Sequence, residues 1–229
     1  MASDVLLYIQ PAYNCLTNTI EYAEVLIRRY KGIESVAEIL KFVCSNELEK
    51  KFDLDVIKEV VNCIKDRELP YPIGVNLCPN TIKCPDIVNN ITKLLDENNI
   101  KYSNIIIEIN ESTDFTDDKV YNNISKLHNL GFKLALDDFG VEKANLYSIV
   151  HYKFDILKVD KSFIGHEREE SKSQILSIIK EICSKFNMKP IIEGVENKRQ
   201  LSKISDMGYT LVQGYIYTEP IPLKEFMLA

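Results

Sequence analysis

Short apolar runs alternate along this chain with stretches in which apolar residues recur at helical spacing. Several of the runs are continuous, as expected for strands that are buried on both faces. The pattern predicts eight strands, at Leu6–Gln10, Tyr22–Arg28, Ile73–Leu77, Ile105–Ile109, Lys133–Asp138, Ile156–Asp160, Pro190–Val195 and Val212–Tyr217. It also predicts amphipathic helices at Leu54–Lys65, Ile87–Leu95, Val120–Leu127 and Ser173–Phe186.

Strands that alternate with helices indicate a parallel sheet. Eight strands within 229 residues favour a closed (β/α)8 barrel over an open sheet, in one domain that spans residues 1–229. No helical pattern separates the first two strands, and Leu16–Ile20 has the character of a turn. We therefore expect an α/β fold, an irregular TIM-like barrel with an antiparallel first strand.

Composition narrows the possible functions. The formal net charge is −6, so binding to a DNA backbone is not expected, although an anionic ligand remains compatible if metal ions supply positive charge. No apolar run is long enough to span a bilayer and no signal-peptide pattern opens the chain, which predicts a cytoplasmic protein without membrane insertion. The six cysteines form no CxxC pair, which favours reduced thiols over a zinc site.

Acidic residues follow directly after apolar runs, where a carboxylate is costly to bury. Ile105–Ile107 leads into Glu108, Leu134–Leu136 into Asp137 and Asp138, and Ile191–Ile192 into Glu193. In barrels of this type the chemistry lies at the carboxyl ends of the strands. The candidates there are Glu24, Asn76, Glu108, Asp137, Asp138, Lys158, Glu193, Glu196 and Gln213. Any one of them alone is more often a strand end, a helix cap or a surface charge, but their recurrence favours a site.

These side chains offer hard oxygen ligands and no His or Cys, which favours Mg²⁺, Mn²⁺ or Ca²⁺ over zinc. Adjacent Asp137 and Asp138 suggest two ions, because one aspartate could bridge both ions while the other binds only one. Two neighbouring ions are the usual arrangement for in-line phosphoryl displacement. Lys158 could hold the attacking water or neutralise developing charge, and Glu196 could hold Lys158 in place. Arg28 could bind a phosphate bidentately.

The residues and their order resemble the EAL domain family, the bacterial phosphodiesterases for cyclic di-GMP. The likeness extends from Tyr8-Ile9-Gln10-Pro11 to Gln213-Gly214-Tyr215. Its motifs are Glu24-Val25-Leu26-Ile27-Arg28, Val75-Asn76-Leu77-Cys78-Pro79, Glu108-Ile109-Asn110-Glu111, Asp137-Asp138-Phe139-Gly140, Leu157-Lys158-Val159-Asp160 and Glu193-Gly194-Val195-Glu196. Each motif is weak alone, and their shared order makes the resemblance specific.

The resemblance implies hydrolysis of one phosphodiester bond of cyclic di-GMP to give linear pGpG, with two Mg²⁺ or Mn²⁺ ions. It implies that Glu24, Asn76, Glu108 and Asp137 hold one ion, and that Asp137, Asp138 and Glu193 serve the other. The candidate catalytic residues are Lys158, Glu193 and Glu196. Glu193 is one candidate for the general base, and a reaction that needs no general base is the alternative. Gln10, Leu26 and Arg28 would contact the dinucleotide, with Gln213 at the edge of the site.

The chain departs from the family after Gly140, where Val141-Glu142-Lys143-Ala144-Asn145-Leu146 replaces the usual Thr-Gly-Tyr-Ser-Ser-Leu. That loop, supported by Glu111, normally shapes the second ion's site and couples it to a homodimer interface. Asn110 replaces a Thr, and Arg29 to Glu38 lacks the family's His-Pro segment, which predicts a shorter substrate rim.

Two alternatives to an enzyme therefore stay open. One is a degenerate domain that binds cyclic di-GMP, or a protein partner, without turnover. The other is an inert structural or dimerisation barrel. The sequence is compatible with a homodimer, and with either a stand-alone protein or a segment of a longer regulated one.

Overall fold

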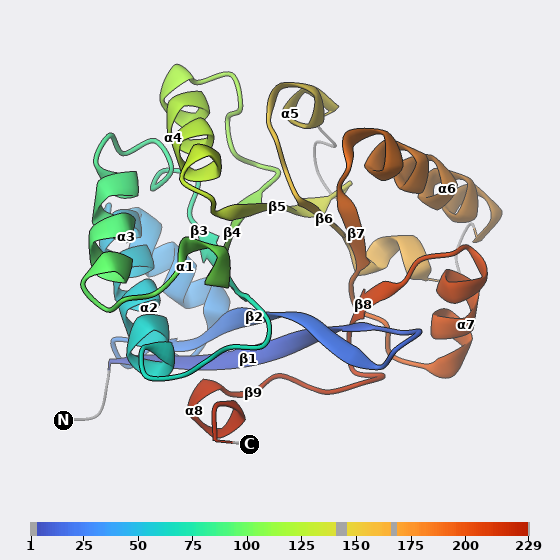
Figure 1. The fold of residues 1–229 in the computed structure, drawn as a ribbon, viewed down its shortest axis with the longest axis horizontal. Helices are drawn as coiled ribbons and strands as arrows, with labels where there is room; N and C mark the ends of the chain where they lie inside the picture. The colour runs from blue at the N-terminus through green and yellow to red at the C-terminus, as the bar shows by residue number, and fades with distance from the viewer. Residues whose placement is uncertain (1–3, 141–145, 166–168, 229) are drawn as a thin grey trace.

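Eight strands form a closed barrel in the computed structural model, which describes residues 4–140, 146–165 and 169–228 (Figure 1). Around the barrel the strands follow the order β2-β3-β4-β5-β6-β7-β8-β1, and β1 pairs with β2 to close it. Their bounds are β1 Val5–Asn14, β2 Thr19–Tyr30, β3 Ile73–Leu77, β4 Ile105–Asn110, β5 Lys133–Phe139, β6 Ile156–Val159, β7 Lys189–Ile192 and β8 Leu211–Gln213. The irregular barrel expected from the sequence is confirmed.

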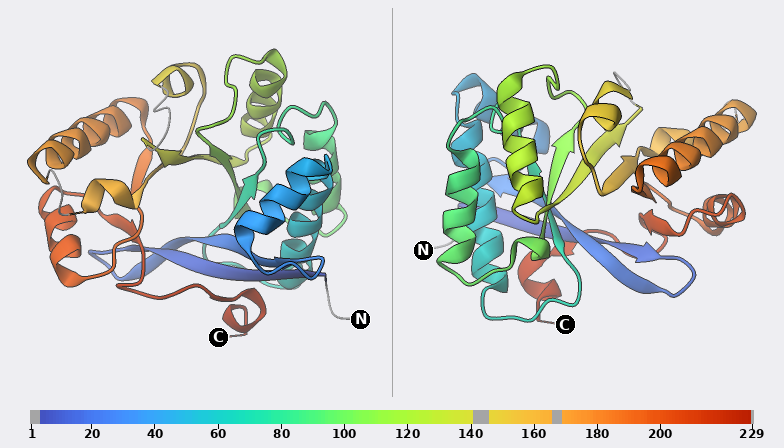
Figure 2. Two further views of the ribbon diagram at one scale, coloured as in Figure 1. Left: turned by 180° about the vertical axis from the view of Figure 1, so that it is seen from behind. Right: turned by 45° about the horizontal axis from the view of Figure 1, so that its top comes forward.

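Helices surround the strands on the outside of the barrel (Figure 2). They are α1 Val36–Ser45, α2 Glu49–Ile64, α3 Ile87–Asp96, α4 Asp118–Asn129, α5 Leu146–His151, α6 Glu169–Phe186, α7 Lys198–Asp206 and α8 Leu223–Phe226, with 3₁₀ turns at Tyr102–Asn104 and Lys161–Ile164. Among the described residues, no helix is both long and apolar enough to cross a membrane.

The first two strands form a long antiparallel hairpin, as the sequence predicted. Its turn follows Asn14, whose side-chain Oδ1 accepts a hydrogen bond from the Leu16 N–H at 3.0 Å, and Asn18 has a left-handed backbone with φ of 56°. β1 is also antiparallel to β8, so one strand of the barrel runs against the other seven. A short strand β9 (Ile221–Pro222) pairs with the outer part of β1.

Parallel pairing places the site residues at neighbouring strand ends. Asn76 of β3 is in register with Glu108 of β4, and Asn110 of β4 is in register with Asp137 of β5. Ile105 through Ile109 are all buried, because helices cover the outer face of β4 while side chains fill the barrel interior. The carboxylates thus end strands that pack on both faces.

The last two strands end earlier than predicted. β7 ends at Ile192 rather than Val195, and Gly194, with φ of 64°, follows it as a turn. β8 ends at Gln213 rather than Tyr217, where the chain passes so close to Val195 that a Cβ on Gly214 would lie 2.2 Å from the Val195 carbonyl oxygen. The close approach of these two loops ends both strands.

Candidate metal centre

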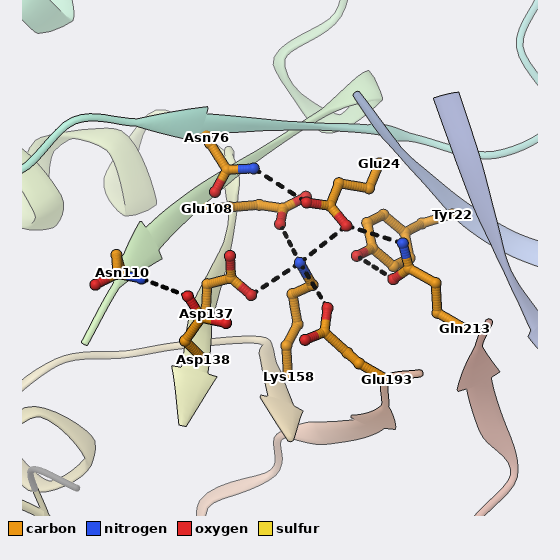
Figure 3. A network of polar contacts seen from close by, with 10 residues as sticks. All are labelled: Tyr22, Glu24, Asn76, Glu108, Asn110, Asp137, Asp138, Lys158, Glu193 and Gln213. Atoms are coloured by element: carbon orange, nitrogen blue, oxygen red, sulfur yellow. Dashed lines mark hydrogen bonds and ion pairs between the residues drawn. The ribbon is translucent and has the colours of Figure 1, made fainter. Parts of the chain in front are cut away.

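The ammonium group of Lys158 lies at the centre of four carboxylates (Figure 3). Its Nζ is 2.7 Å from Glu108 Oε2, 2.8 Å from Asp137 Oδ1, 3.0 Å from Glu193 Oε1 and 3.1 Å from Glu24 Oε2. The side chain of Lys158 is 1% exposed and that of Glu108 is 0% exposed. One cation cannot neutralise four carboxylates, so the cluster carries excess negative charge that invites further cations or protons.

Burial and mutual repulsion set the protonation of this cluster. The pKa of Glu108 is well above its usual range because of burial, which the Lys158 charge only partly opposes. Burial also raises the pKa of Glu193 to about 8 and that of Asp138 to about 6. Burial by itself lowers the pKa of Lys158. The surrounding carboxylates, led by Asp137, together raise this pKa by more than burial lowers it, so the ammonium stays charged. The carboxylates therefore favour neutralisation by cations.

Neutral groups hold Glu24 from both sides. Asn76 Nδ2 donates to Glu24 Oε1 at 3.1 Å, and Gln213 Nε2 donates to Glu24 Oε2 at 2.8 Å. The hydroxyl of Tyr22 in turn donates to Gln213 Oε1 at 3.4 Å, and burial raises the pKa of this phenol well above 10. Because the hydrogen bonds engage both oxygens, the orientation of the Glu24 carboxylate is set before any ligand arrives.

Asp137 and Asp138 both point into the site because β5 contains a bulge. Leu136 pairs with Leu157 and Phe139 with Val159, so β5 takes three steps where β6 takes two. Asp138 absorbs the extra residue in a left-handed backbone with φ of 57°. On a regular strand two adjacent side chains would face opposite sides of the sheet.

The residues present fit divalent cations. Carboxylate oxygens of Glu24, Glu108 and Asp137 lie within 4.8 Å of one another, and so do those of Asp137, Asp138 and Glu193. Within the described part of the chain, Glu108 Oε1 is buried without a hydrogen-bond partner. It lies against Gly74, where a Cβ would come within 1.9 Å of it. A buried, unpaired oxygen among hard ligands is what an absent Mg²⁺ or Mn²⁺ ion would leave.

A cleft of about 560 Å³ lies beside the cluster. Leu26 and Arg28 of β2 line it, together with Asn76 and Asn110 from the strand ends. The Arg28 guanidinium stacks over the Tyr8 ring at 5.5 Å from its centroid. Gln10 pairs with Glu24 across the hairpin, and its Nε2 donates to the Thr218 carbonyl at 3.1 Å. A guanidinium and apolar side chains beside a carboxylate cluster suit an anionic ligand with apolar parts.

Three residues lie elsewhere than the sequence predicted. Glu196 is exposed and, among the described residues, makes no ion pair with Lys158, whose carboxylate partner from this segment is Glu193. Gln213 is buried against Glu24 rather than lying at the edge of the site. Glu24 lies in the middle of β2 rather than at its end, since that strand continues to Tyr30.

The loop after β5 is only partly described. Glu111 Oε2 accepts a hydrogen bond from the Gly140 N–H at 3.0 Å, so Glu111 does support the start of that loop. The divergent residues 141–145, on which the sequence placed altered ion binding and a dimer contact, lie outside the described residues.

Sequence reasoning missed Tyr22 and Gly74. Tyr22 is two residues before Glu24, and residues two apart on a strand share a face. The sequence alone could therefore have placed Tyr22 beside Glu24. Gly74 carries no side chain, and its role depends on Glu108 of the neighbouring strand, so no pattern along the chain could indicate it.

Comparison with protein families matches residues 2–220 to the EAL domain. The "Probable cyclic di-GMP phosphodiesterase PdeA" of Escherichia coli K12 is 29% identical over 231 residues, which cover 97% of this chain and 31% of that protein. This chain therefore spans about a third of that relative.

Two solved structures show the same fold. A "standalone versatile EAL protein" from Vibrio cholerae O395 bound to c-di-GMP has a TM-score of 0.84 and 23% identity, over 97% of this chain and 94% of that one. A manganese and c-di-GMP complex of Klebsiella pneumoniae BlrP1 has a TM-score of 0.85 and 22% identity, over 97% of this chain and 57% of that one.

Proposed function

This chain belongs to the EAL domain family, and on that premise we propose that it hydrolyses cyclic di-GMP to linear pGpG with two divalent cations. The observation that carries the proposal is the cluster of five carboxylates, four of which form ion pairs with Lys158. The cluster contains the unpaired Glu108 oxygen and lies beside a cleft that Arg28 lines. The relative PdeA is named as a probable phosphodiesterase for this nucleotide, and the structure of BlrP1 contains manganese with it.

Two groups of ligands would hold the ions. Glu24, Asn76, Glu108 and Asp137 would bind one, while Asp137, Asp138 and Glu193 would bind the other, with Asp137 shared. Bound ions of this kind lower the pKa of water and offset the charge that develops on a phosphate. Hydrogen bonds from Asn76 and Gln213 already orient Glu24, which reduces the reorganisation needed for binding.

The side chains of this protein would supply the remaining steps. Lys158 donates a hydrogen bond to Glu108 and forms an ion pair with Asp137 at the centre of the cluster, where it can orient the attacking water and stabilise developing negative charge. Glu193, whose carboxylate lies 3.0 Å from Lys158 Nζ and next to Asp137 and Asp138, is the candidate general base. Arg28 would bind a phosphate oxygen while Leu26 contacts the apolar part of the nucleotide.

Incubation with cyclic di-GMP in Mg²⁺ and in Mn²⁺, with separation of products by chromatography, tests the proposal. We expect linear pGpG from the unaltered chain, and a loss of at least 100-fold in rate for Glu24→Ala, because that carboxylate is both a ligand and a Lys158 partner. Glu21→Ala is the matched control. This variant removes a carboxylate from the same strand. In the described structure Glu21 makes an ion pair with Lys189 and none with Lys158, so the variant should leave the rate unchanged.

The outcomes separate the competing functions. An unchanged rate in Glu24→Ala would refute the assignment of the site. Binding of cyclic di-GMP without product in either metal would instead identify a receptor. Absence of both nucleotide and metal binding would identify a structural barrel.

A further inference from the structure

Asn110, at the end of β4, forms two hydrogen bonds through opposite ends of one amide. Its Oδ1 accepts from the Ser112 backbone N–H at 2.9 Å, which is a local turn bond. Its Nδ2 donates to Asp138 Oδ2 at 2.7 Å, across to the next strand (Figure 3). The bond to Ser112 settles which end of the amide faces Asp138, because only the NH₂ group can then point at the carboxylate.

Asp138 needs such a partner more than its neighbours do. Its backbone is left-handed, with φ of 57°, a region uncommon outside glycine that aspartate adopts more readily than most residues when its side chain is hydrogen-bonded. Its carboxylate also lies next to that of Asp137, and the two repel each other. Unlike Asp137, Asp138 makes no ion pair with Lys158 in the described structure. The amide of Asn110 therefore orients the Asp138 carboxylate, and because it is neutral it does not compete with a metal ion for that carboxylate.

We infer that Asn110 is the positioning residue of the second ion site: by holding Asp138 Oδ2 it orients the carboxylate toward Asp137 and Glu193. The inference rests on the proposed two-ion function and adds to it a residue that acts through Asp138 rather than as a ligand of either ion. Groups that hydrogen-bond to a metal ligand commonly contribute about 10–100-fold to metal affinity. Two ligands of the first ion site, Glu24 and Glu108, are held by partners other than Asn110, so loss of this amide should affect the second site most.

Titration with Mn²⁺, followed by the electron paramagnetic resonance of the free ion, tests this without substrate. Asn110→Ala removes both hydrogen bonds. Asn110→Ser keeps a hydroxyl that can accept from the Ser112 N–H but is too short to reach Asp138. Asn98→Ala is the matched control, since in the described structure that amide donates to the nearby Leu94 carbonyl and to no residue of the cluster. Asp138→Ala shows the effect of losing the ligand itself.

We expect both Asn110 variants to bind the first ion within about twofold of the unaltered protein and the second about 10–100-fold more weakly. A purely structural role in the turn predicts instead that Asn110→Ser binds both ions normally. Second-ion affinities within twofold of the unaltered protein in both variants, or a single ion bound by the unaltered protein, would overturn the inference. A protein that binds two ions but forms no pGpG would refute the proposed function and leave this inference standing.

Discussion

Replacing Lys158 with methionine removes the positive charge and keeps a side chain of similar length. The ammonium is fully buried and within 3.1 Å of four carboxylates. Methionine fills the space but cannot donate a hydrogen bond or balance charge. Lys158→Met therefore isolates the electrostatic role of this residue in the metal-free protein.

Removal of one partner from a buried ion pair costs about 3–5 kcal/mol, because the remaining charge is left without compensation. At roughly 2–4 °C per kcal/mol for a chain of this size, the melting temperature should fall by about 6–20 °C. Proton uptake by the carboxylates limits this loss. The pKa of Glu193 is already raised to about 8 by burial, so the loss should be larger at pH 8.5 than at pH 6.5.

Thermal unfolding of both proteins at pH 8.5, in EDTA and in saturating Mn²⁺, measures the effect. A divalent cation supplies the charge that the variant lacks, so we expect the difference in melting temperature to shrink when Mn²⁺ is present. The surface variant Lys189→Met, which loses only an exposed pair with Glu21, should melt close to the unaltered protein in both conditions.

Two results would refute this reasoning. A fall in the melting temperature of Lys158→Met of less than about 2 °C in EDTA would show that Lys158 does not balance the charge of the carboxylate cluster. An equally large loss in EDTA and in Mn²⁺ would show that the cluster and the ion site are unrelated, and would argue against the ligand assignment itself.

Two further variants test groups beside the cluster. Asp53, 1% exposed on α2, has a pKa raised from 3.8 to about 6 by burial, which hydrogen bonds from Cys78 only partly offset. The protonated Asp53 carboxyl therefore contributes about 3 kcal/mol to the free energy of unfolding below pH 3.8. This contribution is lost as the pH rises through 6, where the buried carboxyl must ionise. Asp53→Asn should gain stability relative to the unaltered protein between pH 4 and 7 in urea unfolding, and a pH-independent difference would contradict this. Gly74→Ala should weaken first-ion binding at least tenfold in the Mn²⁺ titration, because the new Cβ would overlap Glu108 Oε1. Gly165→Ala should not, because its Cβ would meet the flexible end of Lys172 and lie in ordinary contact with the Ser162 carbonyl. Equal first-ion affinities of Gly74→Ala and the unaltered protein would contradict the role of Gly74.

Much of the fold was predictable because local patterns carry it. Continuous apolar runs marked strands buried on both faces, and helical spacing between them indicated parallel pairing. The absence of a helix before Tyr22 indicated the antiparallel hairpin that the structure contains. Other elements were missed. Helices α5 and α8 have six and four residues, too few for a periodic pattern to emerge, and α1 and α7, with ten and nine residues, were also not predicted.

The sequence by itself determined which residue types end the strands, and therefore the chemistry available to the site. Carboxylates that follow apolar runs at Glu108, Asp137 and Glu193 had to meet near one barrel mouth once the strands were parallel. The order of these residues was sufficient to indicate the family.

Only the tertiary structure decided which of these side chains touch. Lys158 meets Glu24, Glu108, Asp137 and Glu193 rather than Glu196, and Asn110 reaches Asp138 because β5 bulges there. The physical reason is that periodicity along a chain reports the face on which a residue lies. Contacts between strands depend on register, bulges and turns, which arise only when the barrel closes.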